Sequence, residues 1–78
     1  MSFSEWIRGK MQEKKLNASD LARALNLKPS AISHWLSDRN LPDPISKDSL
    51  PGILDCTLIE VLLITHKTEV KRANEKAI

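Results

Sequence analysis

A chain of 78 residues with 41% hydrophobic and 28% charged residues is long enough for one small domain with its own core, and this composition excludes a disordered tail. The single cysteine, Cys56, excludes an internal disulfide framework, and the longest apolar run, residues 58–64, is too short to cross a bilayer. The net charge of +2 lies entirely in the tail, because residues 1–65 carry eight basic and eight acidic side chains. The first residues lack the pattern of a signal peptide, so we expect a cytoplasmic protein.

The first predicted helix begins at Phe3, because Ser2 and Glu5 have the spacing of a capping box. It should end near residues 14–15, two lysines whose charge suits the negative end of the helix dipole. Gly9 in its interior predicts the close approach of another helix. The apolar side chains recur on one stripe with helical spacing: Phe3, Ile7 and Met11, with Trp6 at the edge.

The second and third predicted helices are joined by only a few residues, 26–28, so the connection must be a tight turn. Asn17 is a good N-cap for the second helix, over about residues 18–25, and Asn26 tolerates the left-handed conformation that ends it. Pro29 suits the first position of the third helix. Two helices joined in this way bring their apolar faces together, as in a helix-turn-helix. The apolar positions are Leu21, Ala22 and Leu25 in the second helix and Ile32, Trp35 and Leu36 in the third.

The chain after the third helix has a weaker pattern. Residues 37–44 have the composition of a loop. A short fourth helix that ends at about Leu54 would be capped by Ser46 or by Ser49. The Pro-Gly pair at residues 51–52 is tolerable in its first turn if Ser49 is the cap.

The last predicted helix begins after Thr57, which is its cap, and runs over about residues 58–66. The polar tail, residues 67–78, either extends this helix in part or frays. No strand pattern occurs in the sequence, so the predicted fold class is all-α. The predicted organisation is one domain over residues 1–66 followed by the tail.

The sequence of the helix-turn-helix matches a known family pattern. The pattern is Leu-Ala-x-x-Leu-Gly-Val-Ser-x-x-x-Ile-Ser-x-Trp followed by proline, and the matching residues are Leu21, Ala22, Leu25, Leu27, Ile32, Ser33, Trp35 and Pro42. Residues 17–42 therefore resemble the Cro/phage-repressor family, also called the XRE family. The resemblance covers residues 1–66 and implies a compact, five-helix domain of the lambda-repressor type, with the helix-turn-helix at helices two and three. Lys28 departs from the capping serine of the family, and Ala18 from a glutamine that clamps a phosphate in many members.

In that family the third helix lies in the DNA major groove, which is wide enough to admit it. Helical geometry turns its apolar residues inward, so the opposite, polar stripe should face the groove. The residues expected to contact bases are Pro29, Ser30, Ser33 and His34. Those expected to contact phosphates are Ser19, Lys28, Ser37, Arg39 and Asn40. Because residues 1–65 carry no net charge, we expect only about two to four phosphate contacts per subunit.

The fifth helix carries more apolar residues than the core needs. Leu58, Val61 and Leu62 suffice to anchor it, and the surplus is Ile59, Leu63 and Ile64. An exposed apolar patch on a small protein indicates a partner, and we expect a two-fold homodimer through these three residues. The dimer would place two recognition helices about one DNA turn apart on a pseudo-palindromic operator. Alternatively, the tail folds back and covers the patch.

Other chemistry has little support in the sequence. Cys56, His34 and His66 lack the paired spacing of metal ligands, and no base with an orienting group accompanies the cysteine. We therefore expect no metal site, no cofactor, no small-molecule ligand, no membrane partner and no enzymatic activity.

The predicted function is that of a sequence-specific DNA-binding transcriptional regulator. The resemblance indicates a phage or prophage repressor or a Cro-like switch protein, which would cover promoter DNA as a dimer in the cytoplasm, associated with the nucleoid. Two alternatives remain open. The first is a DNA-binding antitoxin, which would use the fifth helix and the tail to hold a toxin. The second is a protein-interaction module that lost DNA binding, favoured by the neutral body and by the departures at Ala18 and Lys28.

Overall fold

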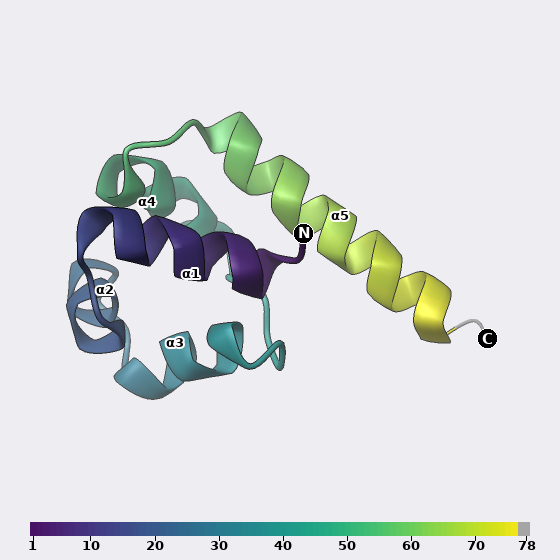
Figure 1. The fold of residues 1–78 in the computed structure, drawn as a ribbon, viewed down its shortest axis with the longest axis horizontal. Coiled ribbons are helices and arrows are strands. Elements are labelled where there is room, and N and C mark those ends of the chain that lie inside the picture. Colours follow the sequence, from purple (N-terminus) through teal and green to yellow (C-terminus); the bar gives the residue numbers. More distant parts are fainter. Residues whose placement is uncertain (77–78) are drawn as a thin grey trace.

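The computed structural model describes the backbone of residues 1–76 and the side chains of residues 1–73; Ala77 and Ile78, the end of the predicted tail, lie outside the described residues. The described residues form five helices and no strand (Figure 1), so the predicted all-α fold is confirmed. α1 crosses the middle of the molecule, α3 lies on one side of it and α4 on the other. The helices are α1 (Phe3–Lys14), α2 (Ala18–Ala24), α3 (Pro29–Leu36), α4 (Pro44–Leu54) and α5 (Leu58–Lys76).

Side-chain caps define the starts of α1 and α2, as the sequence predicts. The Glu5 amide donates to Ser2 Oγ at 3.4 Å, and the Ser2 amide donates to the Glu5 carboxylate at the same distance. Asn17 and Asp20 form the equivalent pair at the start of α2, at 2.8 and 3.1 Å. Asn26 has a φ of 57°, the left-handed conformation predicted for the turn between α2 and α3.

The start of α4 differs from the prediction. The cap is Asp43, whose side chain accepts from the Ser46 amide at 3.2 Å, and Pro44 occupies the first helical position. Neither Ser46 nor Ser49 caps this helix. An aspartate followed by proline is itself a start signal, because the carboxylate satisfies an amide and proline has no amide to satisfy. Pro51 consequently lies in the interior of α4, where the helix loses one hydrogen bond.

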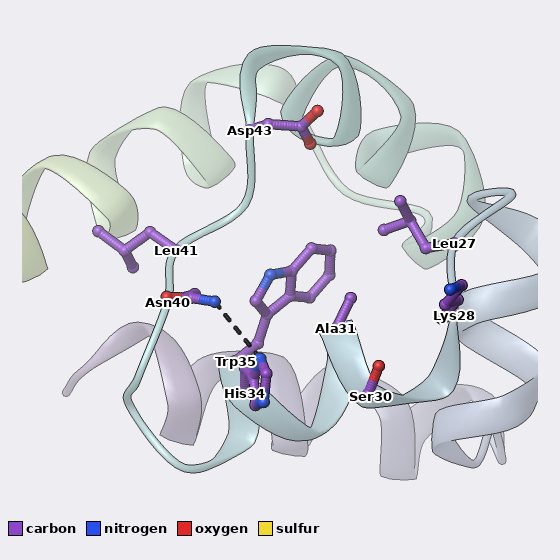
Figure 2. Close-up of a pocket in the computed structure, with 9 residues that line it drawn as sticks. All are labelled: Leu27, Lys28, Ser30, Ala31, His34, Trp35, Asn40, Leu41 and Asp43. Carbon is purple, nitrogen blue, oxygen red and sulfur yellow. Dashed lines mark hydrogen bonds between the residues drawn. The ribbon is translucent and has the colours of Figure 1, made fainter.

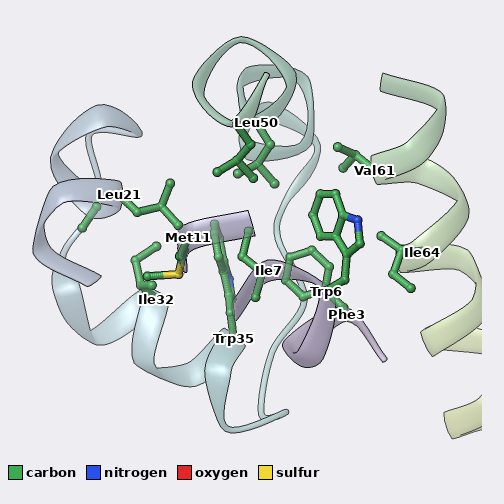
Figure 3. Close-up of a cluster of buried hydrophobic side chains, with 12 residues drawn as sticks. Phe3, Trp6, Ile7, Met11, Leu21, Ile32, Trp35, Leu50, Val61 and Ile64 are labelled. Atoms are coloured by element: carbon green, nitrogen blue, oxygen red, sulfur yellow. The ribbon is translucent and has the colours of Figure 1, made fainter. Parts of the chain in front are cut away.

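The core lies where α1 meets the other helices (Figure 3). The rings of Phe3 and Trp35 meet edge to face, with centroids 6.0 Å apart, and Trp6 lies 5.8 Å from Phe3 on the other side. Trp35 is buried, as the sequence predicts, and Trp6, expected at the edge of the stripe, is buried as well. The buried apolar residues are Phe3, Trp6, Ile7, Met11, Leu21, Ala22, Ile32, Trp35, Leu50, Leu54, Val61 and Ile64.

α5 presents a different face to the core from the one predicted. Ile64 is only 8% exposed and belongs to the core, so its assignment to a dimer interface is wrong. Leu58 and Leu62, expected to anchor the helix, are 40% and 44% exposed. The face of α5 that is buried with Val61 and Ile64 contains Thr65 and Thr68, whose hydroxyls donate to the carbonyls four residues earlier. These internal hydrogen bonds satisfy the two hydroxyls, so the threonines are buried without an unpaired polar group.

Gly9 does not mark a close approach of two helices, as the sequence led us to expect. A Cβ built at this position would meet no atom within 4 Å. Alanine has a helix propensity about 1 kcal/mol better than glycine, so Gly9→Ala should raise the free energy of unfolding by about that amount. Urea denaturation followed by circular dichroism would measure the change. A loss of stability instead would mean that the helix needs the glycine at this point.

Candidate nucleic-acid interface

The four residues expected to contact bases lie together on the surface of α3. Pro29, Ser30 and Ser33 are exposed, and His34 is half-buried. Ile32, on the opposite face, is fully buried and fixes the helix against the core. Sequence periodicity therefore assigned the two faces of α3 correctly, and the polar stripe is free for contact with a ligand.

The start of α3 lacks a side-chain cap. Lys28 occupies the N-cap position with extended backbone geometry, and its side chain makes no capping hydrogen bond. The side chain is exposed at the leading end of the polar stripe. The Lys28 cation is thus held at the start of a helix, although the positive end of the helix dipole favours negative charge there.

A concavity of about 510 Å³ runs beside the polar stripe, between α3 and the loop that follows it (Figure 2). It brings Asn40, from the loop after α3, together with Lys28, Ser30 and His34. Ser19 is exposed in the first turn of α2 and does not line the concavity. The lining residues are Leu27, Lys28, Ser30, Ala31, His34, Trp35, Asn40, Leu41 and Asp43.

The loop after α3 folds back onto the end of the helix. The His34 carbonyl accepts from the amides of Arg39 at 2.9 Å and Asn40 at 3.4 Å, and from the Ser37 hydroxyl at 3.3 Å. The Asn40 side-chain amide lies 3.5 Å from His34 Nδ1. Three of the predicted phosphate contacts, Ser37, Arg39 and Asn40, are therefore grouped around one predicted base contact, and all three are exposed.

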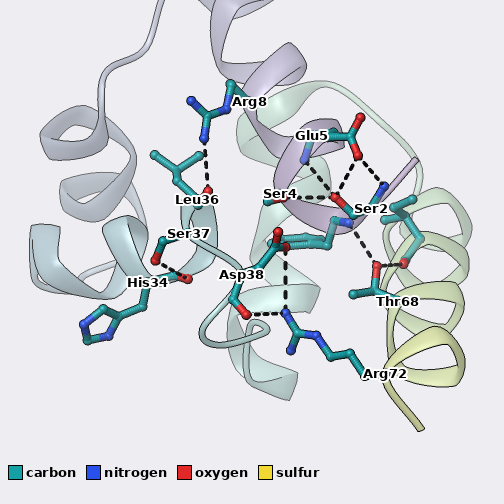
Figure 4. Close-up of polar contacts among 12 residues, drawn as sticks. Ser2, Ser4, Glu5, Arg8, His34, Leu36, Ser37, Asp38, Thr68 and Arg72 are labelled. Carbon is teal, nitrogen blue, oxygen red and sulfur yellow. Dashed lines mark hydrogen bonds and ion pairs between the residues drawn. The ribbon is translucent and has the colours of Figure 1, made fainter. Parts of the chain in front are cut away.

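Two arginines from distant helices hold the end of α3 and the loop after it, and the sequence pattern indicated neither. Arg8 of α1 donates to the Leu36 carbonyl at 3.0 Å, and Arg72 of α5 donates to the Asp38 carbonyl at 2.7 Å (Figure 4). The last carbonyls of a helix always need donors. That general need is the signal that the sequence offers for such a contact, and it does not tell which cation supplies the donor.

Asp43 brings a negative charge to the concavity, on the far side from Ser30 and His34 in Figure 2. Hydrogen bonding from the Ser46 side chain, and to a smaller extent from its amide, lowers the pKa of the Asp43 carboxyl. A carboxyl with a lowered pKa stabilises the fold above its unfolded pKa, and this contribution is lost as the pH falls through the folded pKa. At neutral pH Asp43 therefore stays ionised and repels an anionic ligand from its end of the concavity.

The remaining reactive side chains form no second site in the described part of the chain. No group of three or more His, Cys, Asp or Glu residues there is placed to hold a metal ion. Burial and the nearby Glu60 raise the pKa of the Cys56 thiol, which keeps it in its unreactive form. Among the described helices, none is long and apolar enough to span a membrane.

Comparison with known proteins supports the identification of α2 and α3 as a helix-turn-helix. Residues 7–60 match a family model described as helix-turn-helix. Among solved structures, the chain is similar to the clp gene regulator ClgR from Corynebacterium glutamicum, with a TM-score of 0.69 and 17% sequence identity over 96% of this chain and 80% of that one. At this identity the likeness concerns the fold. No curated protein matches the chain.

Proposed function

This chain belongs to the Cro/C1-type helix-turn-helix family of DNA-binding transcription regulators, and from that premise we propose that it is a repressor or Cro-like switch protein of a phage or prophage. It binds a pseudo-palindromic operator as a dimer and covers the promoter, in the cytoplasm and associated with the nucleoid. The observation that carries the proposal is the exposed polar stripe of α3, bordered by the folded-back loop that carries Ser37, Arg39 and Asn40.

Base reading in this proposal is by short side chains. Ser30 and Ser33 donate or accept at base edges, and Pro29 contacts a thymine methyl group. Their short reach requires the backbone of α3 to approach the bases closely, so that part of the sequence preference comes from the shape of the DNA.

His34 has a defined role in this readout. A side-chain amide that donates to Nδ1, as the 3.5 Å contact from Asn40 allows, leaves the proton of the neutral ring on Nε2. The ring then offers a donor, which pairs with an acceptor in the major groove: N7 of a purine, O6 of guanine or O4 of thymine. We propose that His34 discriminates against cytosine at its position in the half-site.

The dimer interface of this proposal is an apolar stripe on α5. Ile59 and Leu63 are 69% and 54% exposed, and Leu58, Leu62 and Val70 widen the stripe. Exposed apolar area of this kind is unusual on a small monomeric protein. The buried Ile64 is left out of the interface, so the partner lies against a face turned away from the core.

Selection from a random duplex library, followed by salt titration of the best duplex, tests the proposal. We expect inverted half-sites about one helical turn apart and a slope of log K against log salt between about −4 and −7 for the dimer. Arg39→Ala should make this slope shallower by about two, because each subunit loses one contact. Lys14→Ala is the control, since this lysine lies at the end of α1 and pairs with Asp55. The absence of any binding at low salt would contradict the proposal and favour the protein-interaction module.

Lys28 should show a conflict between stability and binding. Serine at this position can cap α3, so Lys28→Ser should raise the free energy of unfolding by about 0.5–1 kcal/mol. The same change removes a phosphate contact and should weaken DNA binding severalfold. Lys28→Ala is the matched variant, because it loses the charge without supplying a cap. If Lys28→Ser binds DNA as tightly as the unchanged protein, the lysine has no role in binding.

A further inference from the structure

The C-terminal part of α5 contacts the candidate DNA interface, although it lies outside the matched family region. The family match ends at residue 60, whereas α5 continues to Lys76. Residues 67–76 also contain all of the net positive charge of the chain. From this segment Arg72 reaches the loop after α3, more than thirty residues away in the sequence (Figure 4).

Arg72 holds the loop at Asp38, a residue with an unfavourable backbone conformation. Its Nη2 donates to the Asp38 carbonyl at 2.7 Å and lies 3.8 Å from the Asp38 carboxylate. Asp38 has a φ of 61°, a left-handed conformation that a residue with a Cβ adopts at a cost. The next two residues are Arg39 and Asn40, both proposed to contact phosphates. Fixing Asp38 therefore fixes the direction in which these two side chains leave the loop.

Independent contacts hold α5 in place for this role. The Phe3 amide donates to the Thr68 hydroxyl at 2.9 Å in the protein interior, one turn before Arg72. Lys47 of α4 pairs with Glu69 at 3.8 Å. Arg72 therefore extends from a helix that is anchored to both α1 and α4, and not from a free tail.

We propose that residues 67–76 are a working part of the DNA-binding unit, in which Arg72 is a positioning residue for the Asp38–Asn40 loop. This inference rests on the proposed function, because the loop is assigned there to phosphate contact. Arg72 acts through the loop and not on DNA itself, since its guanidinium faces the Asp38 carbonyl and is paired with the Asp38 carboxylate.

The test compares Arg72→Ala with Lys71→Ala, which removes the same charge from the neighbouring, exposed position. Arg72→Ala should weaken binding to the selected duplex about fivefold and make the salt slope shallower by no more than Arg39→Ala does, because it acts through the phosphate contacts of the loop. Lys71→Ala should stay within twofold of the unchanged protein. A slope that becomes shallower by a further two when Arg72→Ala is added to Arg39→Ala would overturn the inference, because it would mean that Arg72 contacts a phosphate directly. Unchanged affinity would overturn it as well.

Two further measurements separate positioning from loss of folding and from failure of the proposed function. In an Arg39→Ala background, Arg72→Ala should add less than twofold, because the charged side chain that it positions is absent and only Asn40 remains. A full fivefold effect there would overturn the inference. The amide resonances of Arg39 and Asn40 should shift in Arg72→Ala without DNA, with circular dichroism unchanged. This readout needs no DNA, so it tests the positioning even if the unchanged protein binds none, and unshifted resonances would overturn it.

Discussion

Replacing Ile59 and Leu63 together by serine should make the protein monomeric and weaken its binding to a pseudo-palindromic duplex by at least about 100-fold. The two side chains are 69% and 54% exposed, so the core does not depend on them and the fold should remain. Two linked recognition helices bind the second half-site as an intramolecular event, and a monomer loses this advantage of about 10²–10⁴-fold. Sedimentation equilibrium and fluorescence anisotropy measure the two effects in the same samples.

The neighbouring residue provides the matched control for this prediction. Ile64→Ser changes the same helix turn, but the side chain is 8% exposed and lies in the core. It should therefore destabilise the fold by several kcal/mol, as expected for a polar group placed in an apolar core. If the Ile59 and Leu63 variant sediments like the unchanged protein, α5 is not the dimer interface.

Trp35→Ala should abolish the folded state at physiological temperature. Removing a buried tryptophan costs about 3–5 kcal/mol, and a domain of this size has a total stability on the order of 5 kcal/mol. Trp35 is 4% exposed and meets the ring of Phe3 in α1. The change removes this aromatic contact between α3 and α1, so helicity and DNA binding should be lost together in a thermal melt and a binding assay.

His34→Ala, one residue away, distinguishes a structural effect from a contact with DNA. His34 is half-buried at the edge of the concavity, so its removal should leave the helicity near that of the unchanged protein. DNA binding should still weaken, and the preference at one position of the half-site should broaden. A Trp35→Ala variant that melts within a few degrees of the unchanged protein would contradict the place of Trp35 in the core.

The helix-turn-helix was predictable because its determinants are local. The spacing of Leu21, Ile32 and Trp35 decides which faces of α2 and α3 are apolar, and caps at Ser2 and Asn17 involve residues only three positions apart. Interactions of this range are the same in a short helix and in a folded protein, so the sequence is sufficient to predict them.

The errors arose where the sequence offered two alternatives of similar local merit. α5 has apolar residues on two faces, and the core receives the face with Ile64 and Thr65 instead of the one with Leu58 and Leu62. The threonine hydroxyls satisfy themselves within the helix, so hydrophobicity alone ranked the faces wrongly. Gly9 is a second case, because only the neighbouring helices determine whether an interior glycine is needed.

By itself, the sequence determined the all-α fold class, the turn between α2 and α3, and the polar stripe from Pro29 to His34, since these follow from periodicity and caps. Tertiary structure alone decided which α5 face is exposed, and that Arg8 and Arg72 hold the end of α3. The physical reason is range. A helix end needs donors wherever it lies, but only the packing of α1 and α5 brings the Arg8 guanidinium to the Leu36 carbonyl and the Arg72 guanidinium to the Asp38 carbonyl in the loop.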